Sequence, residues 1–161
     1  MAQTVTPAAS PTASRLIGAG RRRRYPRGYG SVVVARVDEQ LVGFAYGFAL
    51  AADTKRWSRL SAPVAPEVVE EWPGRTFLLF DFAVHDSLRG RGVGRALHDR
   101  LLGSRAEERA TLMVQPVAGD TKAIYEHWGW RKIGQTEGGP TAAAPVFDVY
   151  LRDQLGDLVP S

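Results

Sequence analysis

The residues best suited to chemistry form a run of glycines and arginines, Arg89-Gly90-Arg91-Gly92-Val93-Gly94-Arg95. An apolar segment at 77–84, typical of a buried strand, precedes this run, and an amphipathic segment at 92–102, typical of a helix, overlaps its end. A glycine-rich loop between a strand and a helix presents backbone N–H groups at the positive end of the helix dipole. Because glycine has no Cβ, such a backbone approaches phosphate oxygens closely. The sequence therefore predicts that residues 89–95 bind a pyrophosphate.

The spacing of these glycines excludes two common nucleotide-binding loops. A dinucleotide-binding loop needs G-x-G-x-x-G, and counting from Gly90 or from Gly92 puts another residue at the third glycine position. A Walker loop needs Gly-Lys-Ser/Thr, and none of the three lysines follows a glycine. The spacing that fits is R-x-x-G-x-G, with Arg89, Gly92 and Gly94 at its fixed positions.

This motif, with Ala83-Val84 before it and a leucine-rich segment after it, resembles the coenzyme A loop of the GNAT superfamily of N-acetyltransferases. The resemblance implies that acetyl-CoA is the cosubstrate. It also implies that the strand at 77–84 and the next strand splay apart beside Val84, so that backbone groups there can pair with the pantetheine amides. The residues that it assigns to CoA binding are Phe82, Ala83, Val84, Arg89, Gly90, Arg91, Gly92, Val93, Gly94 and Arg95.

A second motif, Tyr125-Glu126-His127-Trp128-Gly129-Trp130, is similar to the Tyr-x-x-x-Gly-Phe ending of this family, with tryptophan in place of phenylalanine. The resemblance implies that Tyr125 lies near the thioester sulfur and protonates the departing thiolate. The alternative is that Tyr125 is an ordinary core aromatic residue. The family often has an asparagine seven residues before this tyrosine, and here that position is Ala118.

The candidate general base is Asp81, within the apolar segment Leu79-Phe80-Asp81-Phe82-Ala83. An amine must lose a proton before it attacks a thioester, and the family commonly carries a glutamate at this position. A carboxylate in apolar surroundings needs a partner or a raised pKa, so a hydrogen-bonded structural aspartate is the alternative. His85 reads as a turn residue before the loop, and it is the other candidate base.

The pattern along the chain predicts an α/β (α+β) fold. The resemblance implies that it is of the GNAT type: a mixed, mostly antiparallel sheet flanked by helices, with a splayed central strand pair. Strands are expected at 31–37, 41–50, 77–84, 111–115, 130–136 and 146–151. Helices are expected at 66–72, at 92–102 and from Asp120 or Thr121 to Trp128. The order β-β-β-α-β-α-β-β, after the short first helix is set aside, is that of the GNAT family and covers about residues 31–152.

The first 30 residues differ in composition from the rest. Residues 1–20 are rich in alanine, threonine, serine and proline, and Arg21-Arg22-Arg23-Arg24 follows. Such a composition does not bury enough surface to order itself. We expect residues 1–30 to be a disordered or weakly ordered basic segment, and residues 31–155 to be an acyl-CoA-binding acetyltransferase domain. Family members usually have a strand and two helices before the hairpin, so we expect either that the acceptor side of this chain is reduced or that the chain is a shortened or misassigned version of a longer protein.

Composition limits the remaining classes of function. The 161 residues include no cysteine and three scattered histidines, so we expect no disulfide, no thiolate catalysis and no metal site. No run of about 18 apolar residues predicts a membrane span. The net charge of +4 is modest, and the arginine cluster reads as a solvated basic segment rather than a nucleic-acid site. No apolar run follows the arginines, so no export signal is predicted, and we expect a cytoplasmic protein. A homodimer is compatible with the sequence.

The sequence thus predicts an N-acetyltransferase that moves the acetyl group of acetyl-CoA to a primary amine of a small molecule, peptide or protein. The alternative is a degenerate acyl-CoA-binding module without catalysis. The acceptor itself is not encoded in any motif. Aromatic residues that could line its pocket, although aromatic residues on a hairpin more often belong to the core, are Trp57, Trp72, Phe44, Tyr46 and Phe48. Glu67, Glu70 and Glu71 could attract a cationic amine, but at this spacing they are most simply a solvated helix face.

Overall fold

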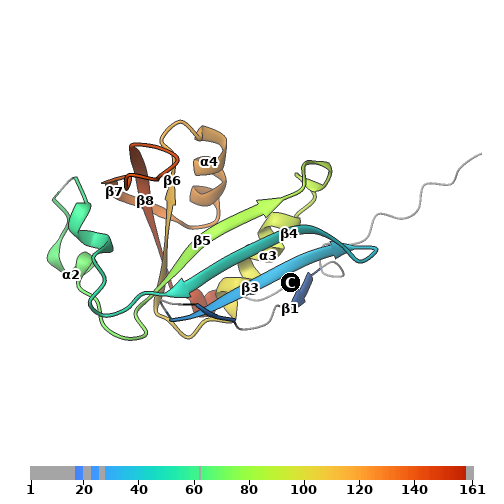
Figure 1. Cartoon of the computed structure of the whole chain (residues 1–161), viewed down its shortest axis with the longest axis horizontal. Coiled ribbons are helices and arrows are strands. Elements are labelled where there is room, and N and C mark those ends of the chain that lie inside the picture. The colour runs from blue at the N-terminus through green and yellow to red at the C-terminus, as the bar shows by residue number, and fades with distance from the viewer. Residues whose placement is uncertain (1–16, 20–22, 26–27, 62, 159–161) are drawn as a thin grey trace, which may run out of the picture.

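The structure, a computed structural model, describes residues 17–19, 23–25, 28–61 and 63–158 (Figure 1). Its strands are β1 (Ile17–Ala19), β2 (Arg23–Tyr25), β3 (Gly28–Val37), β4 (Gln40–Ala49), β5 (Thr76–Val84), β6 (Arg109–Val114), β7 (Arg131–Glu137) and β8 (Val146–Asp153). Its helices are α2 (Pro66–Val69), α3 (Val93–Gly103) and α4 (Gly119–His127). Three short 3-10 helices are η1 (Arg56–Arg59), η2 (Asp86–Leu88) and η3 (Leu155–Asp157).

Within this part of the chain the strands form one sheet in the order β1-β3-β4-β5-β6-β8-β7, with β2 also paired to β3. Every pairing is antiparallel except β5 with β6, which is parallel and covers only Thr76–Leu78 against Arg109–Thr111. Beyond Leu78 the two strands diverge, as Figure 1 shows, and no described strand pairs with this edge of β5. This confirms the predicted mostly antiparallel sheet with a splayed central pair.

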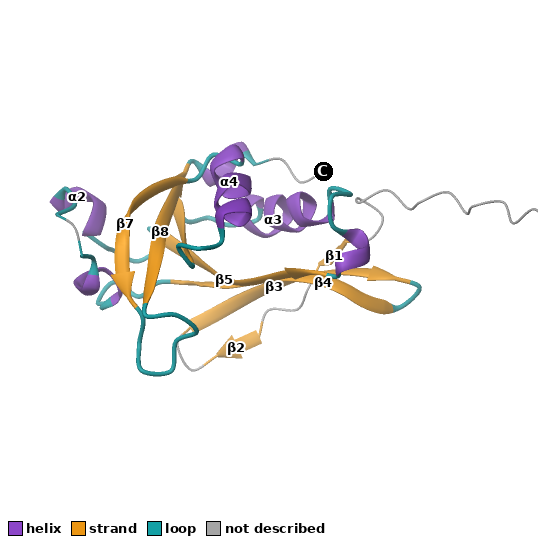
Figure 2. Ribbon diagram, turned by 90° about the horizontal axis from the view of Figure 1, so that it is seen from above, coloured by secondary structure: helices purple, strands orange, loops and turns teal. Residues whose placement is uncertain are grey.

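Helices α3 and α4 lie on the same side of the sheet (Figure 2). The apolar stripe of α3 consists of Val93, Leu97 and Leu101, all buried, as the helical spacing predicts. These side chains pack with Phe77 and Leu79 of β5 in the main core. The packing fixes the start of α3, and with it the glycine-rich loop, against the end of β5.

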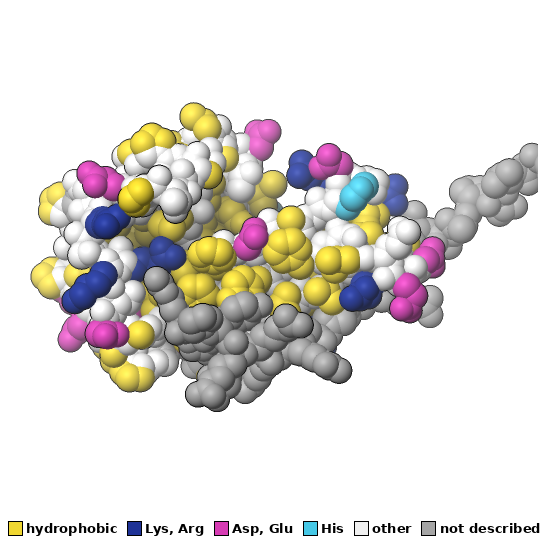
Figure 3. All heavy atoms as spheres, viewed as in Figure 1, with side chains coloured by type: hydrophobic (Ala, Val, Ile, Leu, Met, Phe, Trp, Pro, Cys, Tyr) yellow, Lys and Arg dark blue, Asp and Glu magenta, His cyan; other side chains and the backbone are white. Residues whose placement is uncertain are grey.

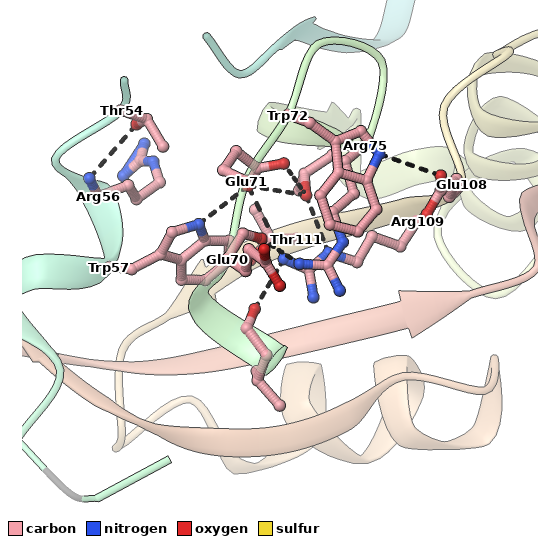
Figure 4. A network of polar contacts seen from close by, with 12 residues as sticks. Thr54, Arg56, Trp57, Glu70, Glu71, Trp72, Arg75, Glu108, Arg109 and Thr111 are labelled. Atoms are coloured by element: carbon pink, nitrogen blue, oxygen red, sulfur yellow. Dashed lines mark hydrogen bonds and ion pairs between the residues drawn. The ribbon is translucent and has the colours of Figure 1, made fainter. Parts of the chain in front are cut away.

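A buried polar cluster closes the narrow end of the splayed pair (Figure 4). Arg109 of β6 is 4% exposed, and its guanidinium donates to Thr76 Oγ1 at 2.9 Å and to the Val68 carbonyl at 2.8 Å. Its Nη2 also lies 3.7 Å from Glu71 Oε2. Burial lowers the pKa of Arg109. The cluster joins the β4–β5 connection to the base of both strands, so the point from which they diverge is held by side chains as well as by the ladder.

Some boundaries differ from the predictions. Helix α2 ends at Val69 instead of Trp72, so Glu70 and Glu71 follow the helix. The expected solvated face is wrong for Glu71, whose side chain is only 3% exposed. Helix α4 begins at Gly119 after Ala118, and neither Asp120 nor Thr121 caps it, because both lie inside its first turn.

The N-terminal segment contributes two short strands, β1 and β2, both paired with β3. Residues 1–16, 20–22 and 26–27 lie outside the described residues. The prediction of a disordered or weakly ordered segment at 1–30 therefore remains a prediction. No helix in the described ranges combines the length and apolar character that a membrane crossing needs.

Candidate functional site

The glycine-rich loop has the backbone geometry that an anion site needs. Gly90 and Gly92 have φ angles of 72° and 80°, a region that residues with a Cβ rarely adopt. A Cβ at either position would meet nothing within 4 Å, so the space above the loop is open. Gly92 precedes the first helical residue of α3, and no side chain caps this end.

The first helical hydrogen bond of α3 runs from the Ala96 N–H to the Gly92 carbonyl, at 3.0 Å. The N–H groups of Val93, Gly94 and Arg95 come before it and have no partner within the helix. They lie at the positive end of the helix dipole. The hydrogen-bond donors for an anion are therefore backbone N–H groups, and Val93 can contribute only its N–H because its side chain is buried. This arrangement fits a pyrophosphate such as that of coenzyme A.

The arginines of the loop differ in what they contact. Arg89 pairs with Asp86 at 3.1 Å, but both side chains are more than 70% exposed, so this ion pair is weak and easily exchanged. Arg95 donates to Asp99 at 2.8 Å and lies over the Trp128 ring. Arg91 forms no ion pair with any residue that the structure describes. Arg91 is thus the loop cation most available to a phosphate, with Arg89 second.

A buried hydrogen-bonded chain connects the loop to the end of α4. Asp99 accepts from Arg95 and lies 2.7 Å from Nδ1 of His98, which is fully buried. The indole N–H of Trp130 donates to Nε2 of His98 at 2.9 Å. An indole only donates, so Nε2 must be the acceptor and the proton resides on Nδ1. Burial lowers the pKa of His98, which keeps the ring neutral.

Both predicted catalytic residues line one cavity of about 470 Å³ where β5 and β6 have separated. Asp81 contributes from β5 and Tyr125 from α4. Its full lining is Leu79, Phe80, Asp81, Phe82, Leu112, Met113, Val114, Gln115, Ala118, Thr121, Tyr125 and Phe147. Ala118, the position where the family often has asparagine, is in this wall and offers no polar side chain.

Tyr125 is 7% exposed, and its ring packs against Trp128 and Trp130 with centroid distances of 5.9 Å. Its hydroxyl has no hydrogen-bond partner among the described residues. Burial, and secondly the negative charge of Asp81, raises the pKa of Tyr125 to about 12. The phenol therefore remains protonated throughout the neutral range.

Asp81 is placed by a bulge that the sequence did not reveal. In the β4–β5 ladder Asp81 faces Tyr46 and Leu79 faces Gly47, so Phe80 is an extra residue. Phe80 is 60% exposed and packs on the rings of Tyr46 and Phe48. The Asp81 side chain is exposed, with Oδ1 accepting from the Phe82 N–H at 2.8 Å. The expected apolar surroundings of this carboxylate are thus wrong, because the bulge turns it toward open space.

His85 is a turn residue in the structure. Its Nδ1 caps η2 by accepting from the Ser87 N–H at 3.3 Å, and it also lies 2.8 Å from the Ser87 hydroxyl. His85 does not line the cavity that contains Asp81 and Tyr125. Among the described residues, no three His, Asp or Glu side chains come together as metal ligands.

Of the aromatic residues considered for an acceptor pocket, Phe48 lines a second, larger cavity of about 740 Å³. Trp57 is buried, and its indole N–H donates to Glu71 at 2.9 Å. Hydrophobic side chains gather over β4 and β5 in the middle of the face shown in Figure 3, with lysine and arginine side chains beside them. Three basic residues line the larger cavity: Lys55, Arg56 and Arg59. The sequence analysis did not select them as site residues, although their clustering in the run Lys-Arg-Trp-Ser-Arg could have indicated a basic site.

Three comparisons bear on this geometry. Residues 28–132 match the family model described as acetyltransferase (GNAT) domain. The L-2,4-diaminobutyric acid acetyltransferase of Nocardia farcinica is 28% identical over 119 residues, which are 74% of this chain and 50% of that protein. The chain thus spans half the length of this curated relative.

Solved structures share the fold. Ard1 from Thermoplasma volcanium superposes with a TM-score of 0.55 at 18% identity, over 76% of this chain and 69% of that one. A GNAT family acetyltransferase from Elizabethkingia anophelis with acetyl-CoA bound gives a TM-score of 0.53 at 11% identity, over 78% of this chain and 76% of that one. With the family model covering most of the chain, from the first long strand through the loop and both main helices, the protein belongs to the GNAT acetyltransferase family.

Proposed function

We propose that the protein transfers the acetyl group of acetyl-CoA to a primary amine of a small molecule or peptide. The observation that carries the proposal is that Asp81 and Tyr125 line a single cavity, reached where β5 leaves β6. β5 also leads, through η2, into the glycine-rich loop. A nucleophile, a carboxylate and a phenol can therefore meet beside a site for the pyrophosphate.

Each residue has a distinct task in this proposal. The unpaired edge of β5 beyond Leu78 offers backbone donors and acceptors to an extended ligand. The exposed carboxylate of Asp81, oriented by the Phe82 N–H, accepts the proton that the acceptor's ammonium must lose before the free amine attacks the thioester carbonyl. The protonated phenol of Tyr125 donates to the sulfur as negative charge develops there. Acetyl-CoA supplies the activated acyl group.

The amine acceptor is supported by chemistry and by likeness. A carboxylate base in the cavity suits a nucleophile that arrives protonated, as primary amines do near neutral pH. The curated relative from Nocardia farcinica has a name that specifies an amine, L-2,4-diaminobutyric acid. We take a small primary amine as the acceptor class of this chain.

The test is release of free CoA in the presence of acetyl-CoA and a panel of primary amines. The chain has no cysteine, so a thiol reagent reports only the thiol of CoA. We expect amine-dependent release that decreases strongly in an Asp81→Asn, Tyr125→Phe double variant. Acetyl-CoA that raises the melting temperature while no amine promotes release would instead indicate a binding module without catalysis.

A further inference from the structure

The larger cavity, of about 740 Å³, adjoins the one that contains Asp81 and Tyr125. Met113 and Phe147 line both cavities. The rings of Phe48, from the larger cavity, and Phe80, from the smaller, lie 5.8 Å apart. A molecule whose reactive end lies by Asp81 can therefore extend past these side chains into the larger cavity.

The charges around the larger cavity are unbalanced. Three of its lining residues are cations, Lys55, Arg56 and Arg59, and one is an anion, Glu137; no other titratable side chain lines it. Lys55 and Arg59 are exposed, and neither forms an ion pair with a described residue. Nη1 of Arg56 lies 3.7 Å from Sδ of Met113, which places a guanidinium at the boundary between the two cavities. Three cations near one carboxylate favour an anionic guest over a cationic one.

The turn that carries these cations is firmly anchored. Within η1, Trp57 is buried and donates to Glu71, which also accepts from Thr76 at 2.8 Å (Figure 4). On the other side, Thr136 Oγ1 donates to the Arg59 carbonyl at 3.3 Å, and Leu60 forms a β-bridge with Thr136. The backbone of the cationic turn is thereby fixed to both β5 and β7, so the basic side chains start from set positions at the cavity rim.

The rest of the lining is apolar or small, including Phe48, Leu50, Met113 and Phe147. A short aliphatic chain fits such a wall, and a terminal carboxylate fits a guanidinium through paired hydrogen bonds. We propose that this cavity binds a carboxylate of the acceptor, so that the acceptor class is a small aliphatic amine that also bears a carboxylate. This inference rests on the proposed acetyl transfer to an amine and narrows its substrate class.

The test compares acceptors that differ only in the carboxylate. Putrescine is ornithine without its carboxylate, and cadaverine is lysine without its carboxylate. CoA release is measured for each of these four amines with saturating acetyl-CoA. We expect kcat/KM about tenfold higher for the amino acids, because a charge-assisted hydrogen bond at a partly exposed site is worth about one order of magnitude. Equal or higher kcat/KM for the diamines would overturn the inference.

Matched variants separate the subsite from general damage. Arg59→Gln should raise the KM for ornithine about tenfold, while the KM for putrescine and the KM for acetyl-CoA stay unchanged. Glu137→Gln should lower the KM for ornithine, since it removes the one carboxylate among the described residues that line the cavity. Arg100→Gln, on the exposed face of α3, is the control and should change the KM for neither amine. An equal effect of Arg59→Gln on both amines would contradict a carboxylate subsite.

A binding measurement keeps the two proposals distinguishable. If no amine of either kind releases CoA, the proposed catalytic function fails, and calorimetric titration of the CoA-loaded protein decides the subsite. Binding of ornithine that exceeds binding of putrescine and is lost in Arg59→Gln would support it. Equal binding of the two amines, or binding of neither, would overturn it.

Discussion

Replacing Tyr125 by phenylalanine isolates the role of one hydroxyl. The ring is 7% exposed and packed between two tryptophans, and its hydroxyl has no hydrogen-bond partner among the described residues. Phenylalanine fills the same space. We therefore expect a folded protein whose melting temperature is within about 2 °C of the original value, because no buried hydrogen bond is broken.

The size of the catalytic effect follows from the raised pKa. The change from 10.0 to about 12 disfavours the phenolate by about 2.7 kcal/mol. A thiol has a pKa near 8.5, so complete transfer of the proton from Tyr125 to a thiolate is uphill by about 5 kcal/mol. Tyr125 should therefore act mainly as a hydrogen-bond donor to the sulfur. Such a charge-assisted bond is worth about 1.5–3 kcal/mol, which predicts a loss of kcat of about 10–100-fold.

The assay is CoA release under saturating acetyl-CoA and amine, with acetyl-CoA affinity measured separately by titration. Tyr125→Phe should lower kcat and leave this affinity unchanged. In the original protein, ionisation of Tyr125 should produce no falling limb in the pH–rate profile below about pH 11. Full kcat in the folded variant would refute the reasoning and leave Tyr125 as a core aromatic residue.

Three further predictions concern other parts of the site. Asp81→Asn should lower the rate most at low pH, where the amine carries its proton, without lowering the melting temperature, and a uniform loss at every pH would argue against a base. Gly92→Val should abolish the thermal shift that acetyl-CoA causes, because φ is 80° there, whereas Gly156→Val, at an open position in η3, should retain it. The pKa of His98 is lowered in the folded state, so its contribution to stability is complete above the unfolded value of about 6.5 and is lost as the pH falls through the folded pKa. Urea unfolding between pH 7.5 and 5 should therefore show a decline that is shallower in His98→Gln, and equal slopes would exclude His98 as the cause.

The parts of the molecule that the sequence predicted are those set by local patterns. The apolar run before the loop, the glycines at 90, 92 and 94, and the leucine stripe after them are contiguous, and each favours the same structure. The family resemblance added the proximity of Asp81 and Tyr125, which are separated by 43 intervening residues in the sequence. Their meeting in one cavity depends on the divergence of β5 from β6, a feature of the sheet that neither strand determines alone.

The features that the sequence did not predict arise from long-range contacts. The segment at 77–84, apolar apart from Asp81, gave no indication that Phe80 bulges outward, because the bulge is defined by the register with β4. Glu71 lies just after a short helix and was expected to be solvated, but Arg109 and Trp57 approach it from distant parts of the chain. The role of Arg59 at a cavity rim depends likewise on its contact with β7.

The parallel contact between β5 and β6 spans only three residue pairs, and this has an evolutionary consequence. The loop and α3 are held by β5, whereas the rim of the larger cavity comes from η1, the end of β7 and the loop at 138–145. Mutations that reshape this rim need not disturb the packing of α3. Under the proposed function, a lineage can therefore diversify what it acetylates by altering the β4–β5 and β7–β8 connections, while the half of the molecule proposed to bind the acyl donor stays under separate selection.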